Sequence, residues 1–247
     1  MLSISELRER HAAVTDRIQA AAQRASRDAM GITLVAVTKT WPADLVIAAY
    51  EAGMRHFGEN RPEELAAKRP VVDVALGLEA GITWHLIGPV QSRKAVLAAE
   101  HADVFHALDR EKIARKLSEE RVDNGRSLPS FIEVNVSGEP SKLGLDLRKW
   151  EQDTTERELL RNMIHTTAAL PGLSVVGLMT MAPWDAEPAI IRGVFKRTKT
   201  LAGWLQSEIP DLGALDLSMG MTDDFEIAIE EGATHVRVGR ALFGERG

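Results

Sequence analysis

The sequence predicts a parallel (β/α)₈ TIM barrel with an extra N-terminal helix, on three observations. Short β-branched runs alternate eight times with helix-like segments over 247 residues, a usual length for such a barrel. No glycine occurs at residues 38–42, after the first run, where an open doubly wound sheet normally has a Gly-rich loop. No low-complexity segment divides the chain, so we expect a single domain over residues 1–247.

The composition excludes several classes of function. The chain is 45% hydrophobic and 27% charged with a net charge of -6, so it can bury a core and offers no basic surface for nucleic acid or anionic membrane. Cysteine is absent, which removes disulfides and thiolate chemistry and fits a reducing compartment. Residues 1–19 are too charged for a secretory signal, and no apolar run reaches transmembrane length. We therefore expect a cytoplasmic protein.

The N-terminal segment predicts a long amphipathic helix before the first strand. Ser3 and Glu6 have the spacing of a capping box, and Leu7, Val14 and Ile18 recur at helical intervals. This pattern is compatible with a helix that packs on its own barrel and with one that pairs two chains. Both a monomer and a homodimer therefore remain open.

The strands and helices of the barrel follow from local periodicity and composition. Each strand prediction rests on a short run rich in valine, isoleucine and other β-favouring residues, and each helix on apolar residues at three- and four-residue steps. The predicted strands cover residues 32–37, 56–58, 83–88, 103–107, 130–136, 175–181, 215–219 and 235–239. The predicted helices cover residues 42–52, 62–68, 92–100, 110–121, 147–169, 187–207, 223–231 and a short tail from 241. Residues 71–81 and 121–130 are predicted as surface connections.

Lys39 is the first candidate for chemistry. In barrels of this type the functional residues come from the C-terminal ends of the strands, and Lys39 lies just past the first. Alternation puts it on the same face as Val35 and Val37, so an inward face would bring its amine over the barrel interior. A partly buried amine is less strongly charged and can form a Schiff base with a carbonyl group. The alternative is an ordinary surface lysine.

The loops after the seventh and eighth strands predict an anion site. Barrels often bind phosphate with these two loops and a helix N-terminus. Ser218 offers a hydroxyl, Gly220 would let backbone N–H groups approach closely, and a residue at 222–223 would cap the next helix. Gly239 and Arg240 lie directly before a short final helix. Ordinary capped turns are the alternative for either loop alone.

Arg237 is the third candidate. His235 and Arg237 alternate with Val236 and Val238, so one of the two pairs faces into the barrel. An inward guanidinium needs a partner, which could be a ligand ring nitrogen, an anion or a carboxylate such as Glu133. A reactive lysine, an anion site and a group for a heteroaromatic ring are together the requirements of pyridoxal 5′-phosphate.

Six segments occur in the order and spacing of a known family: LVAVTKTWP, FGENRPEE, WHLIGPVQSRK, EVNVSGEPSKLGL, GLMTMAP and LSMGMTDDFEIAIEEGATHVRVGRALFG. Over essentially its whole length the sequence closely resembles the YggS-type pyridoxal phosphate homeostasis proteins. The resemblance implies the barrel of the alanine racemase N-terminal domain, without the second β-domain of that enzyme.

The resemblance also implies roles for particular residues. Lys39 would hold pyridoxal phosphate as a Schiff base, Asn60 would lie beside the cofactor, and Arg237 would approach the pyridine nitrogen. The implied phosphate contacts are Ser218, Gly220, Met221, Gly239 and Arg240. No catalytic residue and no metal ligand is implied.

Other residues are less specific or depart from the family pattern. His85 either lines the mouth or is a structural histidine, Glu59 either orients loops or is solvated, and Lys142 is either a second rim lysine or an ordinary one. The remaining histidines singled out, at 11, 101, 106 and 165, are scattered along the sequence and predict no metal site. The departures from the commoner family residues are Trp41 (for lysine), Arg61 (for tyrosine), Arg93 (for asparagine) and Arg240 (for threonine or serine).

The function implied by the resemblance is pyridoxal phosphate homeostasis, with transient supply of the cofactor to apo-enzymes that use it. A racemase-like enzyme is the alternative, and a Schiff-base aldolase is a third possibility. Racemisation needs an acid or base on each face of the cofactor, but Tyr50, the one tyrosine, lies in a predicted helix far from the mouth. Arg237 at the pyridine nitrogen would also weaken the ring as an electron sink. We therefore expect a non-catalytic protein.

Overall fold

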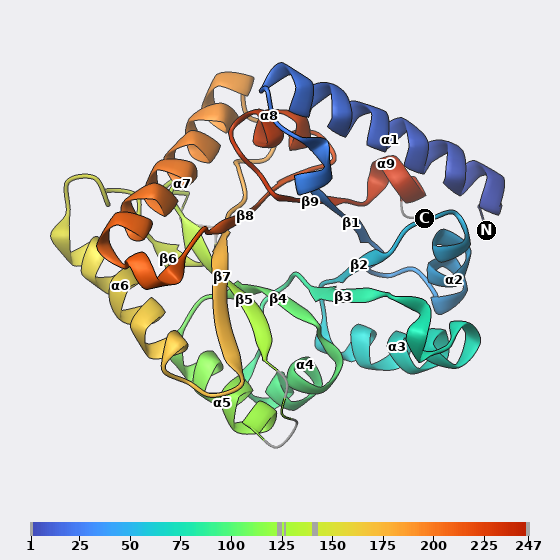
Figure 1. The fold of residues 1–247 in the computed structure, drawn as a ribbon, viewed down its shortest axis with the longest axis horizontal. Coiled ribbons are helices and arrows are strands. Elements are labelled where there is room, and N and C mark those ends of the chain that lie inside the picture. Colours follow the sequence, from blue (N-terminus) through green and yellow to red (C-terminus); the bar gives the residue numbers. More distant parts are fainter. Residues whose placement is uncertain (1, 123–124, 126, 140–142, 246–247) are drawn as a thin grey trace.

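Parallel strands close into a barrel in the computed structural model of the chain, which describes residues 2–122, 125, 127–139 and 143–245. The barrel strands are β1 (Thr33–Val37), β2 (His56–Glu59), β3 (Thr83–Leu86), β4 (Val104–Leu108), β5 (Leu128–Asn135), β7 (Leu173–Met179), β8 (Asp216–Met221) and β9 (His235–Val238). Each pairs with the next, and β9 pairs with β1, so the ring is closed (Figure 1). The short strand β6 (Leu145–Asp146) pairs in parallel with the last residues of β5, outside the ring. The predicted fold class is confirmed.

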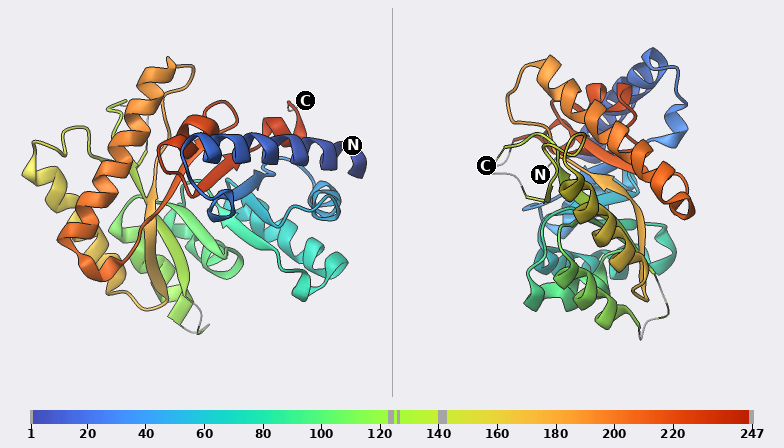
Figure 2. Two further views of the ribbon diagram at one scale, coloured as in Figure 1. Left: turned by 45° about the horizontal axis from the view of Figure 1, so that its top comes forward. Right: turned by 90° about the vertical axis from the view of Figure 1, so that its left-hand side faces the viewer.

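The helices surround the ring on its outer side (Figures 1 and 2). They are α1 (Ile4–Arg24), α2 (Ala43–Glu51), α3 (Pro62–Leu76), α4 (Ala95–His101), α5 (Glu111–Arg121), α6 (Thr154–Ala168), α7 (Pro188–Glu208), α8 (Phe225–Glu230) and α9 (Arg240–Phe243). In the described part of the chain, no helix has the length and apolar character needed to cross a membrane.

Several predicted boundaries are wrong, most of all at α3 and α6. Helix α3 continues to Leu76, through part of the predicted connection at 71–81, because Leu65 and Val72 are buried on one face across Pro70. Residues 147–153 precede α6 instead of belonging to it, and Asp153 caps that helix by accepting a hydrogen bond from the Thr155 N–H. Strand β5 begins at Leu128, inside the predicted connection at 121–130.

Helix α1 packs on the seam where the first and last strands of the barrel meet. The predicted capping box is present, since Ser3 Oγ accepts from the Glu6 N–H and Glu6 accepts from the Ser3 N–H. The buried face of the helix contacts α2, α8 and α9 (Figure 1). Arg17 and Arg24 pair with Glu226 and Glu230 at 2.9 and 2.7 Å. The helix therefore packs on its own barrel.

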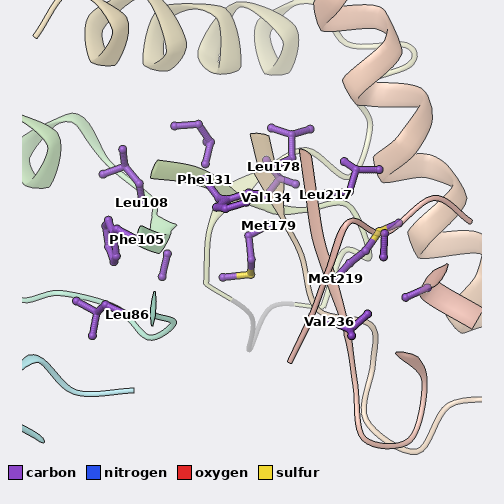
Figure 3. Close-up of a cluster of buried hydrophobic side chains, with 14 of the residues drawn as sticks. Leu86, Phe105, Leu108, Phe131, Val134, Leu178, Met179, Leu217, Met219 and Val236 are labelled. Carbon is purple, nitrogen blue, oxygen red and sulfur yellow. The ribbon is translucent and has the colours of Figure 1, made fainter. Parts of the chain in front are cut away.

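The two faces of the strands differ in polarity. Apolar side chains such as Phe105, Leu178, Leu217 and Val236 form the main hydrophobic core (Figure 3). The barrel interior is instead partly polar: in it the rings of His106 and His235 lie close to that of Phe131, and the ring of His85 lies beside both histidines. This polar interior lies directly under the end of the barrel where the candidate site is found.

Gly177 provides a test of strand packing. A Cβ atom on this β7 residue would lie 2.0 Å from the Asp216 carbonyl oxygen of β8, so β7 and β8 would have to move apart. We expect Gly177→Ala to lower the free energy of unfolding by roughly 2–3 kcal/mol, as overpacking does. The control is Gly203→Ala in α7, where a Cβ meets nothing within 4 Å; it should be neutral or stabilise by up to about 1 kcal/mol. Urea unfolding of both variants measures the difference, and equal stabilities would contradict the packing argument.

Candidate functional site

A cavity of about 490 Å³ lies at the C-terminal ends of the barrel strands. Six residues predicted for the site border it: Lys39, Asn60, Met221, Arg237, Gly239 and Arg240. They come from the ends of β1, β2, β8 and β9 or from the residues that directly follow these strands. The fold thus brings residues from both ends of the sequence around one space, of a size usual for small-molecule sites (roughly 300–1,000 Å³).

Ser218 and Gly220 do not belong to the described residues that border the cavity. Ser218 is fully buried in the barrel interior, where its hydroxyl contacts Arg237 and His106. Gly220 has φ +93°, and a Cβ there would lie 2.6 Å from Ala228 Cβ and 2.8 Å from Phe225 Cα. We expected this glycine to allow the close approach of an anion. The structure gives a different reason, which is close packing against α8.

A buried ion pair fixes the chain just before Lys39. Thr38, the preceding residue, donates its hydroxyl to Glu59 Oε1 at 2.7 Å. Lys68 Nζ donates to the same Glu59 oxygen and to the Thr38 carbonyl oxygen, both at 2.8 Å. Glu59 at the end of β2 and Lys68 on α3 therefore hold the end of β1 from two sides. Lys39 itself is partly buried and borders the cavity.

Two opposing effects act on the charge of Glu59 in this ion pair. Burial raises the pKa of Glu59, and the hydrogen bond and charge of Lys68 oppose that rise. Glu59 Oε2 has no hydrogen-bond partner within the described residues. Removing Lys68 would leave a buried carboxylate uncompensated, which is strongly destabilising. Lys68 was missed by the sequence argument because a lysine on a helix is normally read as exposed.

The turn that follows Lys39 is also held by specific contacts. Thr40 has φ +69°, in the left-handed region, and its N–H donates to Glu64 Oε2 at 2.8 Å. Trp41, which departs from the family's usual lysine, packs partly buried against the hydrophobic core. The other departures on this side, Arg61 and Arg93, are exposed. Trp41 therefore contributes packing in the turn after Lys39.

Arg237 faces into the barrel. Its guanidinium donates to the Ser218 carbonyl oxygen at 2.8 Å, to Ser218 Oγ at 2.6 Å and to the Thr180 carbonyl oxygen at 3.0 Å. Val236 and Val238 point the other way, into the hydrophobic core. Burial lowers the pKa of Arg237 to about 10, so the group remains charged at neutral pH. The charge of Arg237 is thus satisfied by the oxygen atoms of Ser218 and Thr180. Glu133 makes no direct hydrogen bond to it among the described contacts.

Glu133 is a cavity residue that the sequence argument considered only as a partner for Arg237. It is 2% exposed, borders the cavity and carries an Oε2 atom without a hydrogen-bond partner among the described residues. Burial, and next the charge of Asp109, raise its pKa to about 7, while Arg237 opposes the rise. The signal in the sequence that could have identified Glu133 is a polar residue between Ile132 and Val134, near the end of a strand. This carboxyl can bind or release a proton near neutral pH.

The loops after β8 and β9 form the other wall of the cavity. The Met221 N–H donates to Asp224 Oδ1 at 2.5 Å, and the Gly239 N–H contacts Thr222 Oγ1 at 3.4 Å. The side chain of Arg240 pairs with Asp223 and lies over the ring of Trp184, 5.2 Å from its centroid. Helix α9 begins at Arg240, and its Leu242 and Phe243 N–H groups already donate to the Gly239 carbonyl oxygen. An anion in the cavity could therefore accept only from the N–H groups at the very start of the helix, those of Arg240 and Ala241.

The histidines form a group that their sequence positions concealed. His56, His85, His106 and His235 come together in the barrel, so the description of His106 as scattered is wrong. Of the two roles left open for His85, the structure gives the interior one, since this histidine is 1% exposed and bonded to two others. The described residues contain no group of three or more histidines or carboxylates arranged for a metal ion. Lys142 lies outside the described residues.

Comparisons with known proteins agree with this architecture. The family model of the alanine racemase N-terminal domain matches residues 11–247. The pyridoxal phosphate homeostasis protein of Pseudomonas aeruginosa is 41% identical over 243 residues, 98% of this chain and 97% of that protein. The protein of the same name from Escherichia coli is 37% identical over 236 residues, 95% and 94% of the two chains. PipY of Synechococcus elongatus, in a structure with pyridoxal phosphate bound, has a TM-score of 0.79 at 34% identity, covering 96% of this chain and 100% of its own.

A closed parallel barrel with a lysine just past its first strand and a cavity at its mouth is, in class, a barrel of the alanine racemase type. The chain belongs to the alanine racemase N-terminal domain family, and within it to the YggS-type pyridoxal phosphate homeostasis proteins. These curated relatives are named as homeostasis proteins and not as enzymes.

The raised pKa of Glu133 predicts how stability depends on pH. Because its pKa in the folded state lies above the usual 4.5, folding favours the protonated carboxyl. The resulting stabilisation is full below about pH 4.5 and is lost as the pH rises through about 7. The difference between 4.5 and about 7 corresponds to roughly 3 kcal/mol.

Glu133→Gln should therefore be more stable than the unmodified protein at pH 8, by up to roughly 3 kcal/mol, with the advantage shrinking towards pH 5. Urea unfolding at several pH values measures it. The control is Glu9→Gln on the exposed face of α1, which should show no such trend. A stability difference that does not change between pH 5 and pH 8 would rule out a raised pKa.

Proposed function

We propose that the chain binds pyridoxal 5′-phosphate in the cavity at the barrel mouth and serves in cofactor homeostasis as a carrier that supplies apo-enzymes. The observation that carries this proposal is one cavity bordered at once by Lys39, Arg237 and the loops after β8 and β9. The names of the curated relatives and the PipY structure with pyridoxal phosphate bound support it. Cysteine is absent from the sequence, which suits a reducing compartment, and we assign the role to the cytoplasm.

The residues around the cavity fit the parts of this cofactor. Bound pyridoxal phosphate supplies an aldehyde, which condenses with an amine with loss of one water, and an electron-accepting ring. Among the described residues, Lys39 supplies the amine that borders the cavity. Gly239 and Arg240 offer backbone N–H groups to the phosphate, and the Arg240 side chain offers a positive charge. Asn60 and Met221 would contact the cofactor from the ends of β2 and β8.

Arg237 would serve the pyridine nitrogen, and its chemistry supports a non-catalytic role. A guanidinium donates hydrogen bonds and keeps its proton, so the ring nitrogen stays unprotonated and withdraws electrons weakly. Tyr50, the one tyrosine of the sequence, lies on α2 with the guanidinium of Arg55 3.9 Å from its ring centroid. It is not among the described residues that border the cavity. A racemase places an acid on the cofactor face opposite its lysine. Among the described residues, no tyrosine at the cavity can supply that acid here.

A racemase-like enzyme is the second candidate, and one observation favours it. Glu133 borders the same cavity as Lys39 and has a pKa of about 7, which suits an acid–base residue. A carrier needs no such group, so the two candidates differ in what Glu133 and Lys39 do to an amino acid.

The first prediction from this function concerns Lys39. Borohydride reduction of the protein with pyridoxal phosphate should fix the cofactor on Lys39, as peptide mass spectrometry would show. Lys39→Ala should lose this adduct and the visible absorbance, yet keep its melting temperature within a few degrees, because a partly buried lysine contributes little packing. The control is Lys112→Ala on the exposed face of α5, which should retain both signals. An adduct on another lysine, Lys142 included, would contradict the assignment.

The second prediction separates a carrier from an enzyme. Protein loaded with pyridoxal phosphate and incubated with L-alanine in D₂O should show little α-deuteration and negligible D-alanine by chiral chromatography. A well-placed acid or base is worth about 10²–10⁴-fold in rate, and we expect it to be missing on one face of the cofactor. In the same period the protein should restore activity to an apo-aminotransferase. Sustained formation of D-alanine that is lost in Glu133→Gln would establish the racemase-like alternative.

A further inference from the structure

A line of hydrogen bonds crosses the barrel interior beneath the cavity. Arg237 Nη1 donates to Ser218 Oγ at 2.6 Å, and Ser218 Oγ lies 2.7 Å from His106 Nδ1. His106 Nε2 lies 2.8 Å from His85 Nδ1, and His85 Nε2 lies 3.0 Å from His56 Nδ1. We call these five residues the interior chain. It starts under the cavity and ends at the first residue of β2, at the opposite end of the barrel.

The interior chain is almost entirely removed from water. Ser218 and His106 are fully buried and His85 is 1% exposed, while His56 is only partly buried. Burial holds the pKa of both His85 and His106 well below its usual range, so both rings are neutral at physiological pH. A neutral imidazole has one N–H donor and one bare nitrogen acceptor. Each ring can therefore donate to only one of its two neighbours, so the hydrogen bonds of the interior chain can run in one of two directions.

Arg237 determines which sense is adopted. A guanidinium can only donate, so Ser218 Oγ accepts from it. The hydroxyl has two hydrogen-bond partners within the described residues, and its own hydrogen must therefore go to His106 Nδ1. His106 then carries its proton on Nε2 and donates to His85 Nδ1. By the same reasoning His85 is protonated on Nε2 and donates to His56.

The reverse sense is disfavoured on two grounds. If His106 Nδ1–H donated to Ser218, the hydroxyl hydrogen would be buried without an acceptor. The reverse sense would also turn the positive end of each N–H dipole towards the guanidinium. In the favoured sense each group presents a lone pair towards Arg237, so a neutral chain stabilises a buried cation without a carboxylate.

Neighbouring groups hold the rings of this chain in place. The ring of His106 stacks on Phe131 with centroids 4.5 Å apart and planes at 22°. His235 lies 5.9 Å from His106, and burial lowers its pKa to about 4, so it brings no charge next to the chain. The orientation of His106 is thus fixed by packing as well as by hydrogen bonds.

We propose that His106 and His85 are positioning residues, which hold Ser218 and the Arg237 guanidinium through a one-way hydrogen-bond chain with both imidazoles protonated on Nε2. The sense of the chain follows from the hydrogen-bond geometry and from the neutral state of the two imidazoles, without reference to the cofactor. Its consequence for the cofactor rests on the proposed function, because Arg237 is the residue assigned to the pyridine nitrogen. Weakening the hydrogen bonds at His106 should then lower the affinity for the cofactor, although His106 is not among the described residues that border the cavity.

The sense of the chain is tested by ¹⁵N NMR of histidine-labelled, full-length protein without added cofactor. His85 and His106 should both appear as neutral Nε2–H tautomers. His56→Phe, at the partly exposed end, removes the last acceptor and should leave His106 in the same tautomer, because the sense is fixed from Arg237. An Nδ1–H tautomer at His106, in either protein, overturns the proposal.

The positioning role is tested with a pair of variants at His106. His106→Leu removes the acceptor for Ser218, and pyridoxal phosphate affinity should fall about tenfold, the usual effect of one buried hydrogen bond. The absorption maximum of the bound cofactor should also shift. His106→Asn keeps an acceptor near the Nδ1 position and should restore the affinity to within about threefold.

The outcomes separate this proposal from the proposed function. If both variants lose thermal stability but bind pyridoxal phosphate as the unmodified protein does, His106 is merely structural and the proposal is wrong. If His106→Leu does not fold, the tautomers in the unmodified protein and in His56→Phe still decide. If the unmodified protein itself fails to bind pyridoxal phosphate, the proposed function falls while the NMR result on the chain stands.

Discussion

The buried charge of Arg237 is the constraint on which the arrangement of the site depends. A guanidinium that is 5% exposed inside a barrel is costly unless oxygen atoms surround it. The Thr180 carbonyl and both oxygens of Ser218 meet that requirement, and Ser218 is in turn held by His106. The same cation partly offsets the rise in the pKa of Glu133. Changing Arg237 would therefore disturb the hydroxyl, the histidines and the carboxyl together.

The lysine at the mouth depends on a separate support. The Glu59–Lys68 pair holds the end of β1 from β2 and α3, while Arg237 is held from β7 and β8. The two supports thus come from different parts of the ring, but they are linked below the cavity, where β9 pairs with β1 and the interior chain runs from Arg237 to His56 at the start of β2. A cofactor bound to both Lys39 and Arg237 would join the same two supports from above.

The strands, Lys39 and Arg237 could be predicted from the sequence because each follows from local pattern. Alternation within one strand decides which side chains face inward, and the end of a strand decides which reach the mouth. The interior chain could not be predicted in this way. His106 and Ser218 are 112 residues apart and meet only because the ring closes with a particular stagger between its strands. The pKa of Glu133 likewise depends on depth of burial, and Asn60 and Met221 were found by resemblance alone.

The seam under α1 has a consequence for how the chain is made. Strand β1 is synthesised early, but one of its two partners is β9, and α1 packs on α8 and α9. During translation the apolar face of α1 and one edge of β1 must therefore wait for almost the whole polypeptide to emerge. An unpaired edge and an uncovered apolar face are the features that invite wrong pairing and aggregation. The partly synthesised chain is thus the form in which this barrel exposes its pairing edge and apolar face together.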